Sequence, residues 1–251
     1  MNRFKSLQDL KAKGKNLEAL LISANVHTGQ IISLVGGRDF RRSPFNRAID
    51  GHRQVGSVMK PLVYLTAMEA INEDGNPYTP MSLIDDSKFT HKYENQSWSP
   101  RNYDKKFHGP VPLFYALKNS MNVPTAKLGL QIGLESIVDV AKRLGITSDL
   151  KPFPSLTLGA FELYPKEVLQ AYSTLAQMGK LTPLNIIERI EDADGDEIFE
   201  NEKESEVQFS PESVATLVGM MKHTILSGTG RGVRSRGFTH PAAGKTGTTS
   251  D

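Results

Sequence analysis

Three short motifs in this chain hold the residue types that acyl transfer through a serine ester requires. They are Ser57-Val58-Met59-Lys60, Ser120-Met121-Asn122 and Lys245-Thr246-Gly247, widely separated in the sequence. Together they provide a nucleophilic hydroxyl, an amine base, a second hydroxyl, an amide and a cation. The sequence therefore predicts chemistry through a covalent ester on serine.

The first motif is predicted to begin a buried helix. A serine in the first helical turn has a backbone N–H without an intrahelical partner, and the positive helix end favours an oxyanion there. Lys60 follows Ser57 by three positions, so both side chains project from one face. Ser57 could instead be a simple N-cap and Lys60 a solvated residue. The apolar residues around both favour a buried helix.

Lys60 needs a strongly lowered pKa to act as a base. A free lysine has a pKa of about 10.4, so a lysine that acts as a base at neutral pH needs its pKa lowered by about three units. That corresponds to roughly 4 kcal/mol of stabilisation of the neutral amine relative to the charged one. Burial and a second cation both favour the neutral amine. Lys245 would be that cation if its segment runs past the start of the helix.

The other two motifs offer groups for proton relay and substrate binding. Ser120 could relay a proton to a leaving amine, and Asn122 could both donate to and accept from a substrate amide. Lys245 and Thr246 could hold a carboxylate. Gly247 would let a substrate backbone approach closely.

The backbone N–H of Thr248 could complete an oxyanion hole with that of Ser57. Taken separately, the second motif could be a helix-capping loop and the third a flexible Gly/Thr loop. Second copies of two motifs lack the right context: Ser148 to Lys151 runs into Pro152, and Ser23-Ala24-Asn25 lies in a predicted strand.

Composition excludes several other classes of protein. The length of 251 residues fits one large domain or two small ones, and 38% apolar residues suffice for a core. The net charge of +2, without a basic stripe interleaved with aromatics, argues against a nucleic-acid partner. The chain has no cysteine, which excludes thiol catalysis and disulfides. The histidines form no ligand pattern and the acidic residues 192–197 do not fit EF-hand spacing, so no metal or other cofactor is predicted.

The first residues are predicted to form a basic, solvated linker over residues 1–16. No apolar run reaches the roughly 18 residues that span a bilayer, and no secretion signal is visible. An exported protein would need an N-terminal portion outside this sequence.

Hydrophobic periodicity predicts a sheet built from both chain ends and covered by helices. Strands are expected at residues 17–26, 30–35 and 245–249, and a hairpin at 184–201. Helices are expected from Ser57 and at residues 113–118, 125–132, 134–144, 167–178 and 211–226. Residues 75–112 are expected to be a long loop with short elements.

With the sequence around them, the motifs resemble the transpeptidase domain of class A penicillin-binding proteins. The resemblance runs from about residue 17 to residue 251. It is also carried by Val35-Gly36-Gly37, Phe45-Asn46-Arg47-Ala48, Pro100-Arg101-Asn102-Tyr103, Gly109-Pro110-Val111 and Gly228-Thr229-Gly230.

The resemblance implies an α/β fold of the α+β type: a five-stranded antiparallel sheet flanked by helices, as in serine β-lactamases. It implies that Ser57 attacks the D-Ala-D-Ala amide of a peptidoglycan stem peptide and that a neighbouring stem amine then takes the acyl group. Lys60 would be the base and Ser120 the relay. Asn122, Lys245, Thr246, Gly247 and Thr248 would bind the substrate. Penicillin would mimic the donor and leave a slow ester.

Members of this family carry a membrane anchor and a glycosyltransferase domain before this region, and two further strands and a helix after it. We therefore expect residues 17–251 to be a transpeptidase domain without its last strands and C-terminal helix. Peptidoglycan stem peptides and β-lactams are the expected partners, at the periplasmic, extracytoplasmic face of the bacterial inner membrane.

Two other functions use the same motifs. A serine β-lactamase would hydrolyse the acyl ester and needs a base for the deacylating water. Glu162 and Glu167 are the candidates, although neither lies in a Glu-x-x-x-Asn context. A β-lactam-sensing or scaffold module would be acylated once without turnover.

Overall fold

The computed structural model describes residues 17–201 and 204–249. The predicted linker at residues 1–16 lies outside the described residues. The described helices are η1 (Gly56–Met59), α2 (Lys60–Met68), α3 (Leu113–Lys118), α4 (Asn122–Ile132), α5 (Leu134–Arg143), η2 (Pro154–Leu158), α6 (Pro165–Ala176), α7 (Pro211–Ser227) and α8 (Gly232–Ser235). No helix within the described ranges is long and apolar enough to cross a membrane.

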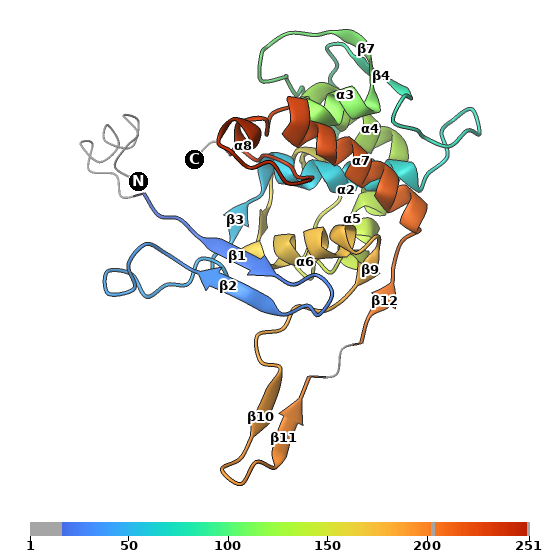
Figure 1. Ribbon diagram of the computed structural model, residues 1–251. Coiled ribbons are helices and arrows are strands. Elements are labelled where there is room, and N and C mark those ends of the chain that lie inside the picture. Colours follow the sequence, from blue (N-terminus) through green and yellow to red (C-terminus); the bar gives the residue numbers. More distant parts are fainter. Residues whose placement is uncertain (1–16, 202–203, 250–251) are drawn as a thin grey trace.

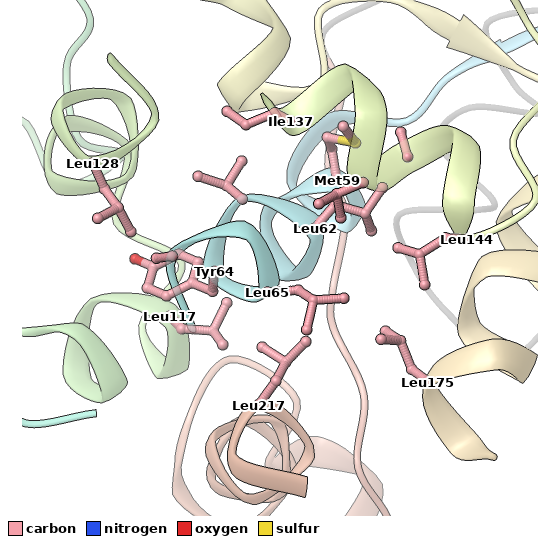
Figure 2. Packing of buried hydrophobic residues seen from close by; sticks show 14 of the residues in the cluster. Met59, Leu62, Tyr64, Leu65, Leu117, Leu128, Ile137, Leu144, Leu175 and Leu217 are labelled. Atoms are coloured by element: carbon pink, nitrogen blue, oxygen red, sulfur yellow. The ribbon is translucent and has the colours of Figure 1, made fainter. Parts of the chain in front are cut away.

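Helix α2 is the centre of the core. Its residues from Lys60 to Ala67 are all buried, as expected for a helix that is apolar on every side. It contacts α3, α4, α5 and α7, which surround it (Figure 1). Leu62, Tyr64 and Leu65 of α2 lie among leucines of α3, α4, α6 and α7 and Ile137 of α5 (Figure 2). The motif lysine is therefore carried by the most buried element of the fold.

The strands form two-stranded antiparallel sheets. The first pairs β1 (Leu21–Ala24) with β2 (Ile31–Val35), and β1 contacts α6 (Figure 1). The other pairs are β3 (Arg53–Gln54) with β8 (Glu162–Leu163), β4 (Leu83–Asp86) with β7 (Gly109–Pro112), β5 (His91–Tyr93) with β6 (Gln96–Trp98), β9 (Lys180–Leu181) with β12 (Glu206–Val207), and β10 (Arg189–Glu191) with β11 (Glu197–Glu200).

Two expectations about the sheet are not met. Residues 245–249 form no strand, because no described strand accepts or donates the ladder hydrogen bonds that a strand needs. For the same reason the described residues contain no five-stranded sheet, and β1–β2 stands as a separate pair. The α/β class itself, helices with antiparallel strands, is as predicted.

Candidate active site

Ser57 lies in a tight turn that leads directly into the central helix. The helix was predicted to begin at Ser57, whereas the structure has a 3₁₀ turn over Gly56–Met59 before α2 begins at Lys60. Gly56 has φ +53°, and a Cβ there would lie 2.7 Å from the backbone oxygen of Thr248, so only glycine fits. The Tyr172 hydroxyl of α6 donates to the Val58 carbonyl at 2.9 Å. The turn is thus in contact with the third-motif segment at Gly56 and with α6 at Val58.

The Lys60 side chain is completely buried and lies against the second motif. Its Nζ donates to the Ser120 carbonyl at 2.7 Å, to the Met121 carbonyl at 3.1 Å and to Asn122 Oδ1 at 2.7 Å. The Ser120 hydroxyl is 3.5 Å away. Every residue of the second motif therefore contacts the amine of the first.

The second motif is a strained loop between two helices. Ser120 joins α3 to α4 with φ +55°, a left-handed conformation that costs a non-glycine residue about 1 kcal/mol. Thr125 Oγ1 donates to the Met121 carbonyl at 2.7 Å, and the buried Tyr64 hydroxyl is 3.1 Å from Thr125 Oγ1. Burial raises the Tyr64 pKa, so the phenol stays neutral. Helix α2 thus supports the loop through the contact of Tyr64 with Thr125.

The third motif lies against the same loop. Lys245 Nζ donates to Ser120 Oγ at 2.7 Å and to the Thr246 carbonyl at 3.0 Å. A Cβ at Gly247 would lie 2.6 Å from Val58 Cγ2, so glycine lets this segment pack closely on η1. The residue was predicted to make room for substrate, and the structure shows a protein neighbour there.

Two lysines share the Ser120 hydroxyl, and both have lowered pKa values. Burial, and then the positive charge of Lys245, hold the Lys60 pKa well below its usual value. Burial lowers the pKa of Lys245 to about 8. Lys245 is mostly protonated at neutral pH, and its charge disfavours a second positive charge on Lys60. The structure thus shows the expected approach of Lys245 to Lys60.

Ser57 itself is half-buried, and its hydroxyl has no hydrogen-bond partner among the described residues. The backbone N–H groups of Ser57 and Thr248 likewise have no acceptor within the described part of the chain. Free N–H groups are what an oxyanion hole needs. The protein therefore brings Lys60, Asn122 and Lys245 into contact around Ser120, and Ser57 lies in the turn that leads into the helix of Lys60.

Glu167, the candidate base for deacylation, is fully engaged in the fold. Its carboxylate accepts from the backbone and hydroxyl groups of Thr147 and Ser148, at 2.6–2.9 Å, and from the Tyr164 N–H at 3.1 Å. Burial alone would raise its pKa, but the hydrogen bonds from Ser148 and Thr147 outweigh burial and the pKa is lowered. Glu167 is therefore a helix-capping carboxylate. Glu162 is exposed in β8.

The second Ser-x-x-Lys sequence has no such environment. Ser148 Oγ donates to Glu167, and Lys151 pairs with Asp149 at 2.7 Å with 61% of its side chain exposed. The two copies therefore differ in environment: Lys60 is buried and Lys151 is exposed.

Three residues without a predicted role support the motif segments, two by direct contact and one through a neighbour. Thr229 Oγ1 is 2.6 Å from Thr246 Oγ1. Asn102 hydrogen-bonds the backbone at the start of α4, and buried Asp86 hydrogen-bonds Asn102. The available signals were Gly228-Thr229-Gly230 and Pro100-Arg101-Asn102-Tyr103, which carried the resemblance without a function attached.

Comparison with known proteins adds independent evidence. The family model described as penicillin binding protein transpeptidase domain matches residues 20–251. The chain is 37% identical over 243 residues to penicillin-binding protein 1B of Vibrio cholerae, covering 96% of this chain and 31% of that protein. It is 37% identical over 238 residues to penicillin-binding protein 1A of Aquifex aeolicus, covering 94% of this chain and 32% of that protein.

Solved structures show the same fold. The crystal structure of penicillin-binding protein 1A from Haemophilus influenzae aligns with a TM-score of 0.84 and 25% identity, over 92% of this chain and 40% of that one. The PonA1 protein of Mycobacterium tuberculosis in complex with penicillin V aligns with a TM-score of 0.76 and 20% identity, over 98% of this chain and 66% of that one. The chain thus spans about a third of the curated relatives given above.

Proposed function

Because the chain belongs to the penicillin-binding protein transpeptidase family, we propose that it is a serine D,D-transpeptidase that crosslinks peptidoglycan stem peptides and is acylated by β-lactams. One observation carries the proposal: fully buried Lys60 donates to the Ser120 carbonyl and to Asn122 Oδ1, while Lys245 donates to the Ser120 hydroxyl. The three motifs, distant in sequence, meet at Ser120.

In the proposed reaction, neutral Lys60 takes the proton of the Ser57 hydroxyl as Ser57 attacks the carbonyl of the D-Ala-D-Ala amide. The backbone N–H groups of Ser57 and Thr248 stabilise the oxyanion. Ser120 relays the proton to the amine of the leaving D-Ala.

Substrate binding and deacylation use the remaining groups. Lys245 and Thr246 hold the donor carboxylate, and Asn122 holds the donor amide, for which its Oδ1 and Nδ2 have capacity left. An acceptor amine then attacks the ester carbonyl, gives its proton back through Lys60 and releases Ser57. A β-lactam follows the first half of this path, but its opened ring stays on the enzyme.

The engagement of Glu167 supports transfer over hydrolysis, because a carboxylate held by Thr147, Ser148 and Tyr164 is not free to activate water against the ester. We further propose that the whole protein has a membrane anchor and a glycosyltransferase domain and works at the extracytoplasmic face of the bacterial inner membrane. This rests on the relatives, of which the chain covers only 31% and 32%.

The proposal is tested with a donor stem peptide, an acceptor amine and nitrocefin, using the full native protein. A transpeptidase is expected to give acceptor-dependent product and to turn over nitrocefin fewer than about once per hour. Rapid nitrocefin turnover would indicate a β-lactamase instead. Stable acylation without any acceptor-dependent product would indicate a sensing or scaffold module.

A further inference from the structure

The start of helix α4 is capped by a residue from a distant loop. The residue before α4 is Met121, whose side chain cannot accept a hydrogen bond from the free N–H groups of the first turn. Asn102 supplies that acceptor: its Oδ1 accepts from the N–H of Asn122 at 2.9 Å and from the N–H of Val123 at 3.0 Å. The backbone of the second motif is therefore tied to the 101–102 segment.

The same segment orients the Asn122 side chain. The Arg101 carbonyl accepts from Asn122 Nδ2 at 2.9 Å, which turns Oδ1 toward Lys60 Nζ at 2.7 Å. A reversed amide would place its NH₂ group against the lysine amine and against no acceptor. The hydrogen bond that Asn122 Oδ1 accepts from Lys60 thus depends on the position of residues 101 and 102.

A buried carboxylate fixes Asn102 in turn. Asp86 at the end of β4 is fully buried, and Asn102 Nδ2 donates to its two oxygens at 2.7 and 2.9 Å. The His108 N–H and Nδ1 also lie 3.0 and 2.8 Å from Asp86 Oδ2. A buried carboxylate is costly without such donors, so Asp86 holds the Asn102 amide with its NH₂ inward and its oxygen toward α4.

This support comes from the region of the β4–β7 pair. Strand β4 contacts α4, and β7 contacts α3, so the β4–β7 pair lies beside both helices that the loop joins (Figure 1). The loop itself carries the left-handed Ser120 at φ +55°. A strained loop persists only where its surroundings hold it.

We propose that Asp86 and Asn102 are positioning residues that hold Ser120 and Asn122 in the geometry that acylation needs. The inference rests on the proposed function for its kinetic consequence and on the hydrogen bonds above for its structural one.

The first test replaces Asn102 with alanine in the full native protein and follows acylation by a fluorescent penicillin. The expected result is a 10- to 100-fold lower acylation rate constant at saturating drug, because a displacement of about 1 Å can cost that much. The matched control is Asn72→Ala. Asn72 Oδ1 also accepts two backbone N–H groups, from Asp74 at 3.1 Å and Asn76 at 2.9 Å, in a turn outside the motifs. Asn72→Ala should leave acylation unchanged.

The second test exchanges the two partners. Asn102→Asp alone sets two carboxylates face to face, and Asp86→Asn alone removes an acceptor from His108 and Asn102, so both should slow acylation. The double variant, Asp86→Asn with Asn102→Asp, again pairs one amide with one carboxylate. The carboxylate at position 102 still offers an oxygen to the N–H groups at the start of α4. It should recover at least about tenfold over Asn102→Asp, the size of a typical coupling between contacting residues. A purely additive double variant would overturn the proposal, because general destabilisation does not produce rescue.

The third readout does not depend on acylation. In Asn102→Ala, the amide protons of Asn122 and Val123 should exchange with solvent at least about tenfold faster than in the wild type, because they lose their acceptor. If the wild type is not acylated, the proposed function fails and this exchange still decides the positioning role. Wild-type exchange at both amides, or a wild-type acylation rate in Asn102→Ala, would overturn it.

Discussion

Lys60→Met is expected to lower the rate constant of acylation by benzylpenicillin about 10³-fold, within the range that a general base contributes. Methionine keeps the buried aliphatic length of the side chain but has no basic atom. Lys60 is buried and contacts all three residues of the second motif. Lys245 is the other described amine that contacts this motif, through the Ser120 hydroxyl. The measurement is stopped-flow or quenched acylation at several drug concentrations.

Lys151→Met is the matched control, because Lys151 ends the other Ser-x-x-Lys sequence and has 61% of its side chain exposed. It should be acylated at the wild-type rate. An unchanged rate in Lys60→Met would remove Lys60 from the role of base.

The same variant reports the Lys60 pKa through stability. A lysine whose pKa is lowered on folding binds fewer protons in the folded than in the unfolded state between the two pKa values. The unfolding free energy of the wild type should therefore rise, relative to Lys60→Met, as the pH increases toward about 10.4. Urea unfolding of both proteins at several pH values checks the sign.

Replacing Lys245 should change the shape of the pH profile as well as the rate. In the wild type, acylation should fall above about pH 8, where Lys245 loses the proton that attracts the drug carboxylate. Lys245→Met removes both that cation and the charge that helps to lower the Lys60 pKa. It should cut acylation at neutral pH about 100-fold. It should also move the ascending limb of the pH profile, which reflects deprotonation of Lys60, to higher pH.

Lys245→Arg separates the two effects, because arginine stays charged. Its ascending limb should remain near that of the wild type, and the fall above about pH 8 should disappear. If the descending limb persists in Lys245→Arg, another group causes it and Lys245 is not the residue that titrates there.

Local signals in the sequence predicted most helices well. The helix expected at residues 113–118 is α3 (Leu113–Lys118), and the one expected at 211–226 is α7 (Pro211–Ser227). These segments have apolar periodicity and clear breakers at their ends. The strand expected at 245–249 is absent, because a strand requires a partner and local sequence cannot show whether one is in place.

The site was predictable to the extent that its residues sit in motifs. Burial of Lys60 followed from the apolar residues beside it, and Lys245 followed from the third motif. Asn102 and Asp86 were not assigned, because their role depends on how residues 83–112 fold back onto α4. Asn102 lies 20 positions before Asn122 and Asp86 lies 16 positions before Asn102, with no periodicity linking them.

Ser57 should be the nucleophile of a site formed by all three motifs. The most direct test is the intact mass of the full native protein after incubation with benzylpenicillin, compared with Ser57→Ala. An adduct of one drug mass is expected on the wild type and none on the folded variant. An adduct that survives in Ser57→Ala, or a folded wild type that forms none, would contradict it.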